Sequence, residues 1–261
     1  MPDCYITSAD NDRIKLYRRL YLDKRYRRKE GLFVLEGARL VSDAAGVINF
    51  HSVFFTEDAR KRYNAAYEKI SAHSRICVIS DDIADTISGT DNPQGVYAIL
   101  RSPEEKPISD IVKDTHKAII LDNIQDPGNM GTMLRTADAC GIDLVVLCEC
   151  CDELSPKVVR SAMGSIMRVR ISHSSFEDAV SSLKEVGYRI YAAVIGDGLH
   201  LGEFDFAQKS AVIIGNEGNG IPEKHAKLAD DPMTIKMHGT VNSLNAAMAA
   251  GIIMWELSRY E

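Results

Sequence analysis

The sequence predicts a two-domain α/β protein whose second domain is built on a parallel β-sheet. Its 261 residues exceed the length of one average domain. Two prolines and several charged residues interrupt the apolar pattern at 101–107, which indicates a break between domains. On both sides of this break, short apolar runs alternate with helical patterns. We therefore expect domains over 1–102 and 117–261, joined by a linker over 103–116.

The first domain is expected to be a small α/β unit. Short apolar runs bounded by turn residues predict strands, and a helical period predicts one helix over 59–72. The expected strands cover 32–35, 52–56, 76–79 and 96–100.

The second domain shows a clearer alternation. Its apolar runs are short and continuous, which is typical of strands buried on both faces of a parallel sheet. The expected strands cover 118–121, 144–147, 190–195, 211–214 and 233–237. The expected helices cover 130–140, 155–164, 176–186, 222–229 and 243–260. Because the last helix is apolar around most of its circumference, we expect it to be buried, either within the chain or against a second subunit.

The composition is that of an ordinary globular protein, with 45% apolar and 26% charged residues. The longest apolar run, 246–254, is too short to span a bilayer, and residues 1–5 lack the layout of a signal peptide. A cytoplasmic protein that does not enter the membrane is expected. Six cysteines include a close group at 148–151, but no zinc-ligand spacing accompanies it. Reduced thiols are therefore expected, and no metal.

Positive charge is concentrated near the N-terminus. The net charge is −6, yet 13–29 contains nine basic residues and one acidic residue, so the rest of the chain carries about −14. This segregation is expected of a protein that grips a phosphate backbone with one region, and equally of a solvated helix face. From charge alone the two interpretations are evenly balanced.

Polar residues follow the expected strand 118–121, at the sheet edge where open α/β folds bind ligands. The turn-forming string Asp126-Pro-Gly-Asn129 predicts a helix that begins at Met130, with Asn129 as its N-cap. Arg135 would lie two turns into this helix. Its guanidinium could reach a phosphate or ribose near the helix start, but spacing alone favours a surface arginine on an amphipathic helix.

A glycine-rich loop follows the expected strand 211–214. Gly215, Gly218 and Gly220 permit positive φ and a close approach of the backbone to a ligand. Their spacing matches neither the dinucleotide fingerprint nor the P-loop. Glu217 lies inside this constrained loop, which counts against a simple surface turn.

A third polar string, 240–246, opens the final helix. Asn242 or Ser243 is expected to cap this helix. Asn245 brings an amide into an otherwise apolar helix, and a buried amide needs hydrogen-bond partners.

In this order, the three strings resemble the three motifs of the SpoU/TrmH family of SPOUT methyltransferases. The similar residues are Asn129-x-Gly131-x-x-x-Arg135, Gly215-x-Glu217-Gly218-x-Gly220 and Ser243-Leu244-Asn245. The stretch 155–164 also fits, and 33–39 and 93–96 are similar to the family's substrate-binding domain. The resemblance covers nearly the whole chain.

The resemblance implies an RNA 2′-O-ribose methyltransferase that uses S-adenosylmethionine and acts as a homodimer, with rRNA favoured over tRNA as its substrate. It also implies an L30e-like N-terminal domain and a SPOUT α/β domain tied in a trefoil knot, which no sequence pattern could predict. The implied catalytic residues are Asn129, Arg135, Glu217, Ser243 and Asn245. The implied cofactor-binding residues are Gly215, Gly220, Ile235 and Leu244.

The hypothesis for the mechanism centres on Arg135. A guanidinium is a poor general base at neutral pH, so Arg135 would bind the adjacent phosphate and stabilise the developing alkoxide. The proton would pass to water or to a phosphate-perturbed guanidinium. Asn129, Ser243 and Asn245 would orient Arg135 and the ribose, and Glu217 would fix either the glycine loop or Arg135.

The basic stretch and the N-terminal domain would select the RNA. The arginines expected to bind it are Arg18, Arg19, Arg25, Arg27 and Arg28. RNA rather than DNA follows from the reaction, because only RNA carries a 2′-hydroxyl.

Two alternatives remain. A non-catalytic RNA-binding protein would keep the fold and the cofactor pocket, although the intact motifs count against it. An unrelated enzyme would bind a nucleotide cofactor at the Gly215 loop, although the absence of a phosphate-binding fingerprint counts against that.

Overall fold

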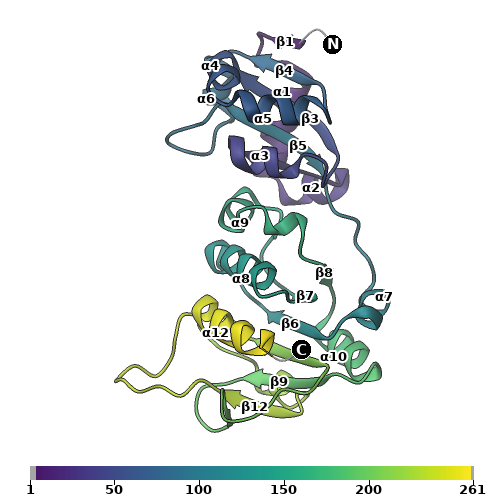
Figure 1. The fold of residues 1–261 in the computed structure, drawn as a ribbon, viewed down its shortest axis with the longest axis vertical. Coiled ribbons are helices and arrows are strands. Elements are labelled where there is room, and N and C mark those ends of the chain that lie inside the picture. The colour runs from purple at the N-terminus through teal and green to yellow at the C-terminus, as the bar shows by residue number, and fades with distance from the viewer. Residues whose placement is uncertain (1–3, 260–261) are drawn as a thin grey trace. The chain divides into compact units, whose positions relative to one another are not determined.

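The computed structural model describes residues 4–259, which fold into two compact units (Figure 1). The first unit contains the chain up to Pro103 together with Leu154–Met167. The second unit contains Glu104–Glu153 and the chain from Arg168 onward. This division differs in two respects from the expected domains. Leu154–Met167 packs with the first unit although it lies between two strands of the second, and the expected linker 103–116 belongs to the second unit from Glu104 onward.

A mixed five-stranded sheet forms the centre of the first unit. Its order is β1 (Cys4–Ile6), β4 (Ile76–Ile79), β3 (Phe50–Thr56), β5 (Val96–Arg101) and β2 (Leu32–Glu36). The strands β1, β4 and β3 are parallel, and β5 runs antiparallel to both of its neighbours. The four strands expected from the sequence are all present.

Short helices surround this sheet. They are α1 (Asp12–Leu22), α2 (Lys24–Glu30), α3 (Ala38–Ala44), α4 (Glu57–Arg62), α5 (Asn64–Ser71), α6 (Asp81–Ile87) and α9 (Pro156–Ser161), followed by a 3-10 turn, Ser165–Met167. The single helix expected over 59–72 is divided at Tyr63, whose φ of −114° and ψ of 43° are not helical. Apolar side chains of α1 and α6 pack with those of the sheet to form one core.

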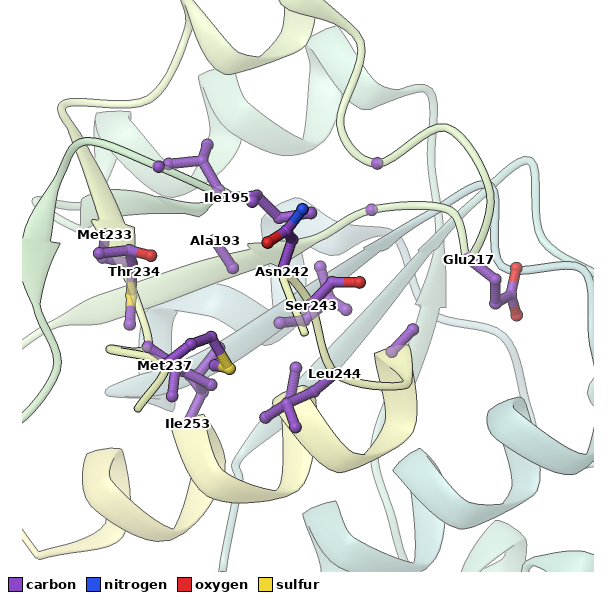
Figure 2. Close-up of a pocket in the computed structure, with 18 of the residues that line it drawn as sticks. Ala193, Ile195, Glu217, Met233, Thr234, Met237, Asn242, Ser243, Leu244 and Ile253 are labelled. Carbon is purple, nitrogen blue, oxygen red and sulfur yellow. The ribbon is translucent and has the colours of Figure 1, made fainter. Parts of the chain in front are cut away.

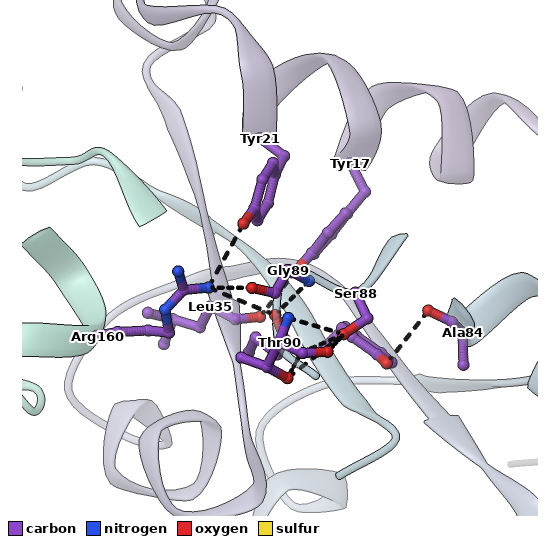
Figure 3. A network of polar contacts seen from close by, with 10 residues as sticks. Tyr17, Tyr21, Leu35, Ala84, Ser88, Gly89, Thr90 and Arg160 are labelled. Atoms are coloured by element: carbon purple, nitrogen blue, oxygen red, sulfur yellow. Dashed lines mark hydrogen bonds and ion pairs between the residues drawn. The ribbon is translucent and has the colours of Figure 1, made fainter. Parts of the chain in front are cut away.

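A buried carboxylate holds one loop and α9 in the first unit. Glu36, at the end of β2, accepts hydrogen bonds from Ser88 Oγ at 2.8 Å, Gly89 N at 3.0 Å and Thr90 Oγ1 at 2.7 Å. Arg160 of α9 forms an ion pair with Glu36 at 3.8 Å and donates to the Gly89 carbonyl at 3.2 Å (Figure 3). These contacts join α9 to the first unit.

Seven parallel strands form the sheet of the second unit, as the continuous apolar runs predict. Their order is β10 (Leu199–His200), β12 (Asp231–Thr234), β9 (Arg189–Ala193), β11 (Ser210–Ile214), β6 (Lys117–Asp122), β7 (Leu144–Cys148) and β8 (Ile171–His173). The expected α/β class with a parallel sheet is therefore confirmed.

The helices of the second unit are α7 (Ile108–Ile111), a 3-10 turn (Val112–Asp114), α8 (Pro127–Ala139), α10 (Phe176–Glu185), α11 (Glu223–Ala226) and α12 (Ala246–Ser258). Alternate residues of the central strands form a core with α7 and α10. The helices α8 and α12 pack against each other (Figure 1). The final helix was expected to end at Tyr260, which lies outside the described residues.

The helix α12 is not buried on every side. Met248, Ile252 and Trp255 are exposed to 60%, 41% and 66%. The chain by itself therefore does not cover the helix completely, which was one of the two alternatives that the sequence left open. Among residues 4–259, no helix is both long and apolar enough to cross a bilayer.

Candidate functional site

The glycine loop after β11 is a tight backbone turn. Asn216 and Gly220 exchange two backbone hydrogen bonds, at 3.1 and 2.9 Å. The Asn216 side-chain oxygen accepts from the backbone of Gly218 at 2.9 Å and of Asn219 at 3.1 Å. A Cβ on Gly215 would lie 2.4 Å from the Gly220 carbonyl carbon, so only glycine fits there. The close backbone approach expected of this loop therefore occurs within the loop itself.

The helix α8 begins earlier than the sequence analysis expected. Its N-cap is Asp126, whose Oδ1 accepts from Asn129 N at 2.8 Å, and Pro127 occupies the first turn. Asn129 is therefore inside the first turn and is not the cap, which corrects that prediction. Because the cap position is already filled, the Asn129 side chain is free to bind other groups.

Three of the predicted catalytic residues form a hydrogen-bonded chain. Asn129 Nδ2 donates to Glu217 Oε1 at 3.1 Å, and Asn245 Nδ2 donates to Asn129 Oδ1 at 3.1 Å. Glu217 also accepts from the backbone of Asp126 at 3.1 Å and of Gln125 at 3.3 Å. Side chains from three segments that are far apart in the sequence thus meet at the N-terminus of α8.

Hydrogen bonds determine the charge state of Glu217. Burial disfavours the carboxylate, but donors from its own backbone, from Asn129, and from the Asp126 and Gln125 amides outweigh burial and lower its pKa. The nearby helix N-terminus favours a negative charge in the same way. Glu217 is therefore an ionised hydrogen-bond acceptor at neutral pH and a weak proton acceptor.

Asn245 is the N-cap of α12. Its Oδ1 accepts from Ala247 N at 2.9 Å and Met248 N at 3.2 Å. Neither Asn242 nor Ser243 caps the helix, contrary to the expectation, and both lie exposed before it. The amide of Asn245 is also exposed, so its partners do not compensate for burial. The amide nitrogen is what joins α12 to the chain of hydrogen bonds.

Arg135 and Ser243 do not join this cluster. Both side chains are exposed, and neither forms a hydrogen bond or ion pair with another residue in the part of the chain that the structure describes. Arg135 lies about two and a half turns after the cap Asp126 on α8, farther from the helix start than expected, because the helix begins earlier. Both groups are accessible to a ligand from solvent.

A cavity of about 790 Å³ lies between the ends of β9, β11 and β12 and the start of α12. All four predicted cofactor-binding residues line it: Gly215, Gly220, Ile235 and Leu244. Figure 2 shows Met237, Leu244 and Ile253 gathered on the α12 side, with Glu217 on the loop at one end. The sequence analysis missed the β9 end of the cavity, Ala193–Gly196, because a short apolar run without polar residues gives no functional signal.

The cavity fits S-adenosylmethionine in size and chemistry. Its volume lies in the range of small-molecule sites, and apolar side chains alternate there with exposed loop backbone. Aliphatic walls suit an adenine ring, whereas backbone N–H and C=O groups suit its polar edge. Gly215 is essential to this shape because a side chain there would push the loop apart.

The basic stretch forms α1 and α2. Arg18, Arg19, Arg25 and Arg28 are exposed, and Arg19 stacks on Tyr26 with its guanidinium 3.8 Å from the ring centroid. These four residues are placed where a phosphate backbone could contact them.

Arg27 differs from its neighbours. Its side chain is 4% exposed and donates to the carbonyls of Leu20 and Tyr21. Those carbonyls lie at the end of α1, where a cation is favourable. Arg27 is therefore a structural residue, which corrects the expectation that it contacts RNA.

Comparison with known proteins gives two family matches. The SpoU rRNA Methylase family matches residues 116–255, and the MRM3-like substrate binding domain matches residues 11–98. The 23S rRNA (guanosine(2553)-2′-O)-methyltransferase RlmP of Bacillus subtilis is 31% identical over 97% of this chain and 98% of its own. The mitochondrial rRNA methyltransferase 3A of Danio rerio is 28% identical over 95% of this chain and 68% of its own.

A solved structure is similar over the same length. The AdoMet-bound rRNA methyltransferase from Sinorhizobium meliloti superposes with a TM-score of 0.86 at 29% identity, covering 98% of this chain and 97% of that one. The likeness therefore extends over both units.

Proposed function

The chain belongs to the SpoU rRNA methylase family, and from this premise we propose that it methylates the 2′-hydroxyl of a ribose in ribosomal RNA with S-adenosylmethionine as the donor. The observation that carries the proposal is the chain of hydrogen bonds from Asn245 through Asn129 to Glu217, beside a cavity of suitable size. Ribosomal RNA is preferred to tRNA because the full-length relatives named above act on rRNA.

The cavity residues would hold the donor at the carboxyl edge of the sheet. Gly215 and Gly220 shape the loop, and Ile235 and Leu244 supply apolar contacts. When bound, S-adenosylmethionine supplies a methyl group on a positively charged sulfur. The protein's contribution is to place the ribose oxygen in line with that methyl group, and positioning of this kind supplies about 7–11 kcal/mol in favourable cases.

The exposed side chains would bind and orient the RNA. Arg135 would bind the phosphate next to the target ribose and stabilise negative charge on the attacking oxygen. Ser243 would orient the ribose. Glu217, Asn129 and Asn245 already form a chain of hydrogen bonds, so they would fix the segments that carry Arg135 and Ser243. The proton would leave to water, since the lowered pKa of Glu217 makes it a weak base.

Methyl transfer to separate pools of unmodified ribosomal and transfer RNA tests this proposal. The wild-type protein should label ribose in the ribosomal pool, and Arg135→Ala should lose most of that activity. Arg135→Lys keeps the charge but loses the planar guanidinium with its paired N–H donors, so its activity should also be reduced. Cofactor binding without transfer to either pool would favour the non-catalytic RNA-binding alternative.

The first unit would select the RNA through α1 and α2. Arg18, Arg19, Arg25 and Arg28 present four exposed cations on two consecutive helices. Phosphate contacts of this kind set affinity and make it depend on salt.

The protein would act as a homodimer in the cytoplasm. Met248, Ile252 and Trp255 form an apolar face on α12, and apolar faces of this kind mark protein interfaces. A charge within this face, as in Trp255→Glu, should yield monomers by sedimentation, whereas Lys227→Glu on the exposed surface should not. A wild-type monomer at micromolar concentration would contradict the dimer, and cell fractionation tests the location.

A further inference from the structure

Asp122 and His225 form a buried pair that does not line the cavity. Asp122 is the last residue of β6 and is 3% exposed. Its Oδ2 lies 2.6 Å from Nδ1 of His225, which belongs to α11 and is 8% exposed. Because a carboxylate accepts hydrogen bonds, the imidazole must donate its Nδ1–H.

The imidazole is held from the other side as well. Its ring stacks on Phe176 of α10, with 3.8 Å between the centroids and 7° between the planes. Nε2 lies 3.8 Å from Glu177 Oε1, which is largely exposed. Within residues 4–259, His225 is the only side chain that hydrogen-bonds the Asp122 carboxylate.

The pair joins the two chain segments that carry Asn129 and Glu217. The first loop leaves Asp122 and runs to the N-terminus of α8. The second loop, Gly215–Gly220, runs into α11 and His225. The loops contact each other between these ends, since Asn216 Nδ2 donates to Asn123 O at 2.8 Å and Glu217 accepts from the backbone of Gln125.

Asn123 leaves little room for adjustment. Its φ of 58° is a left-handed conformation, and its backbone N–H donates to the Cys148 carbonyl at 2.8 Å. A shift at Asp122 would therefore pass directly into the segment that binds Glu217. The pair fixes the start of one loop to the end of the other.

We propose that Asp122 and His225 are positioning residues for methyl transfer, which set the register between the 123–129 loop and the 215–220 loop and thereby hold Glu217 and Asn129 in place. The inference rests on the proposed function for its kinetic consequence. Its structural consequence, the fixed register of the two loops, does not depend on that function.

Hydrogen–deuterium exchange and steady-state kinetics on the full-length protein test the inference together. His225→Phe keeps the ring stack on Phe176 but removes the hydrogen bond. Amide exchange in 123–129 and 215–220 should become faster, while exchange in β6 and β11 stays slow. The kcat should fall on the order of 100-fold, as small misplacements of reacting groups cause, with the KM for RNA unchanged.

Two further variants separate positioning from stability. His225→Asn places an amide N–H near the position of Nδ1, so it should restore loop protection and most of kcat. Asp122→Leu with His225→Phe removes the unpaired buried carboxylate and should recover the melting temperature, because apolar replacements of buried pairs are tolerated. This double variant should remain slow in kcat. Lys184→Met, which removes an exposed ion pair to Asp230 in the same unit, is the matched control.

The outcomes decide between the possibilities. Normal loop protection and normal kcat in His225→Phe, or full recovery of kcat in the double variant, would refute the positioning role. His225→Asn behaving like His225→Phe would refute the hydrogen bond as its cause. If the wild type methylates no RNA, the proposed function fails, and the exchange data still show whether the pair fixes the loops.

Discussion

Replacing Gly215 with alanine tests whether the closed glycine loop shapes the cofactor cavity. A Cβ at this position would lie 2.4 Å from the Gly220 carbonyl carbon and from Ile221 N, and 2.6 Å from the Gly220 carbonyl oxygen. All three are backbone atoms, so no rotamer change relieves the clash. Ordinary contact begins at 3.4 Å, so one side of the loop must move by about 1 Å.

Two ways of relaxing this clash have similar costs. A loop that stays closed is overpacked, which costs about 1–3 kcal/mol. A loop that opens loses the two backbone hydrogen bonds between Asn216 and Gly220, at about 1 kcal/mol each. With about 2 kcal/mol of strain the closed and open loops of Gly215→Ala have similar free energies, and with about 3 kcal/mol the open loop is favoured by about 1 kcal/mol. If only the closed loop binds the cofactor, the affinity should fall by about 2-fold to 6-fold.

Calorimetric titration with S-adenosylmethionine measures this loss. The matched control is Gly218→Ala in the same loop, where a Cβ would meet only Asn216 Oδ1 at 3.6 Å and φ is not positive. Gly218→Ala should bind as the wild type does. Equal affinity of Gly215→Ala, Gly218→Ala and the wild type would show that the cavity does not depend on this contact.

Four other variants test separate parts of the structure. Because the pKa of Glu217 lies below its usual 4.5, the carboxylate stabilises the fold fully above that pH and loses this effect as pH falls through the lowered pKa. Glu217→Gln should thus be less stable than the wild type at pH 7, with the gap closing in acid, as measured by urea unfolding; a constant gap would contradict this. Asn129→Asp would place a second carboxylate beside Glu217, and its kcat should fall on the order of 100-fold. Retained activity in a methyl-transfer assay would show that the hydrogen bond from Asn129 to Glu217 is not needed for the reaction. Neutralising Arg25 and Arg28 should weaken RNA binding and reduce its salt slope by about 0.7 for each phosphate that the protein no longer binds. Arg27→Gln should instead lower the melting temperature and leave that slope unchanged.

Apolar periodicity was sufficient to predict the sheet of the second unit. Its central strands are short, continuous and buried on both faces, so the hydrophobic signal is not mixed with solvent-facing residues. The edge strands β8 and β10 have three and two residues, which is too short for any pattern. The packing of Leu154–Met167 with the first unit includes the Arg160–Glu36 ion pair, and a contact between residues so far apart leaves no local trace in the sequence.

Both helix caps were assigned to the wrong residue for the same reason. Several cap-forming residues lie close together before each helix, and local preference does not decide between them. For α8 the sequence did contain a signal, since Pro127 favours the first helical position and makes Asp126 the cap. For α12 the sequence analysis considered Asn242 and Ser243 and placed Asn245 inside the helix, although asparagine caps a helix as well as serine does.

Arg27 shows a limit of reasoning from charge. Net charge over 13–29 gave five arginines the same role, although a helix has a buried face and an exposed face. Leu20 and Arg27 lie on different helices, because Asp23 between them is extended, with a φ of −114° and a ψ of 106°. The period of the first helix therefore does not continue to Arg27, and the sequence pattern could not identify Arg27 as buried.

The structure divides the motif residues into two groups. Asn129, Glu217 and Asn245 form hydrogen bonds with one another and with the backbone. These hydrogen bonds fix the three side chains in position, and a substrate could use only their remaining N–H groups and lone pairs without breaking one of them. Arg135 and Ser243 are exposed, and their donors are accessible from solvent. We therefore expect three motif residues to build the proposed site and two to contact the RNA.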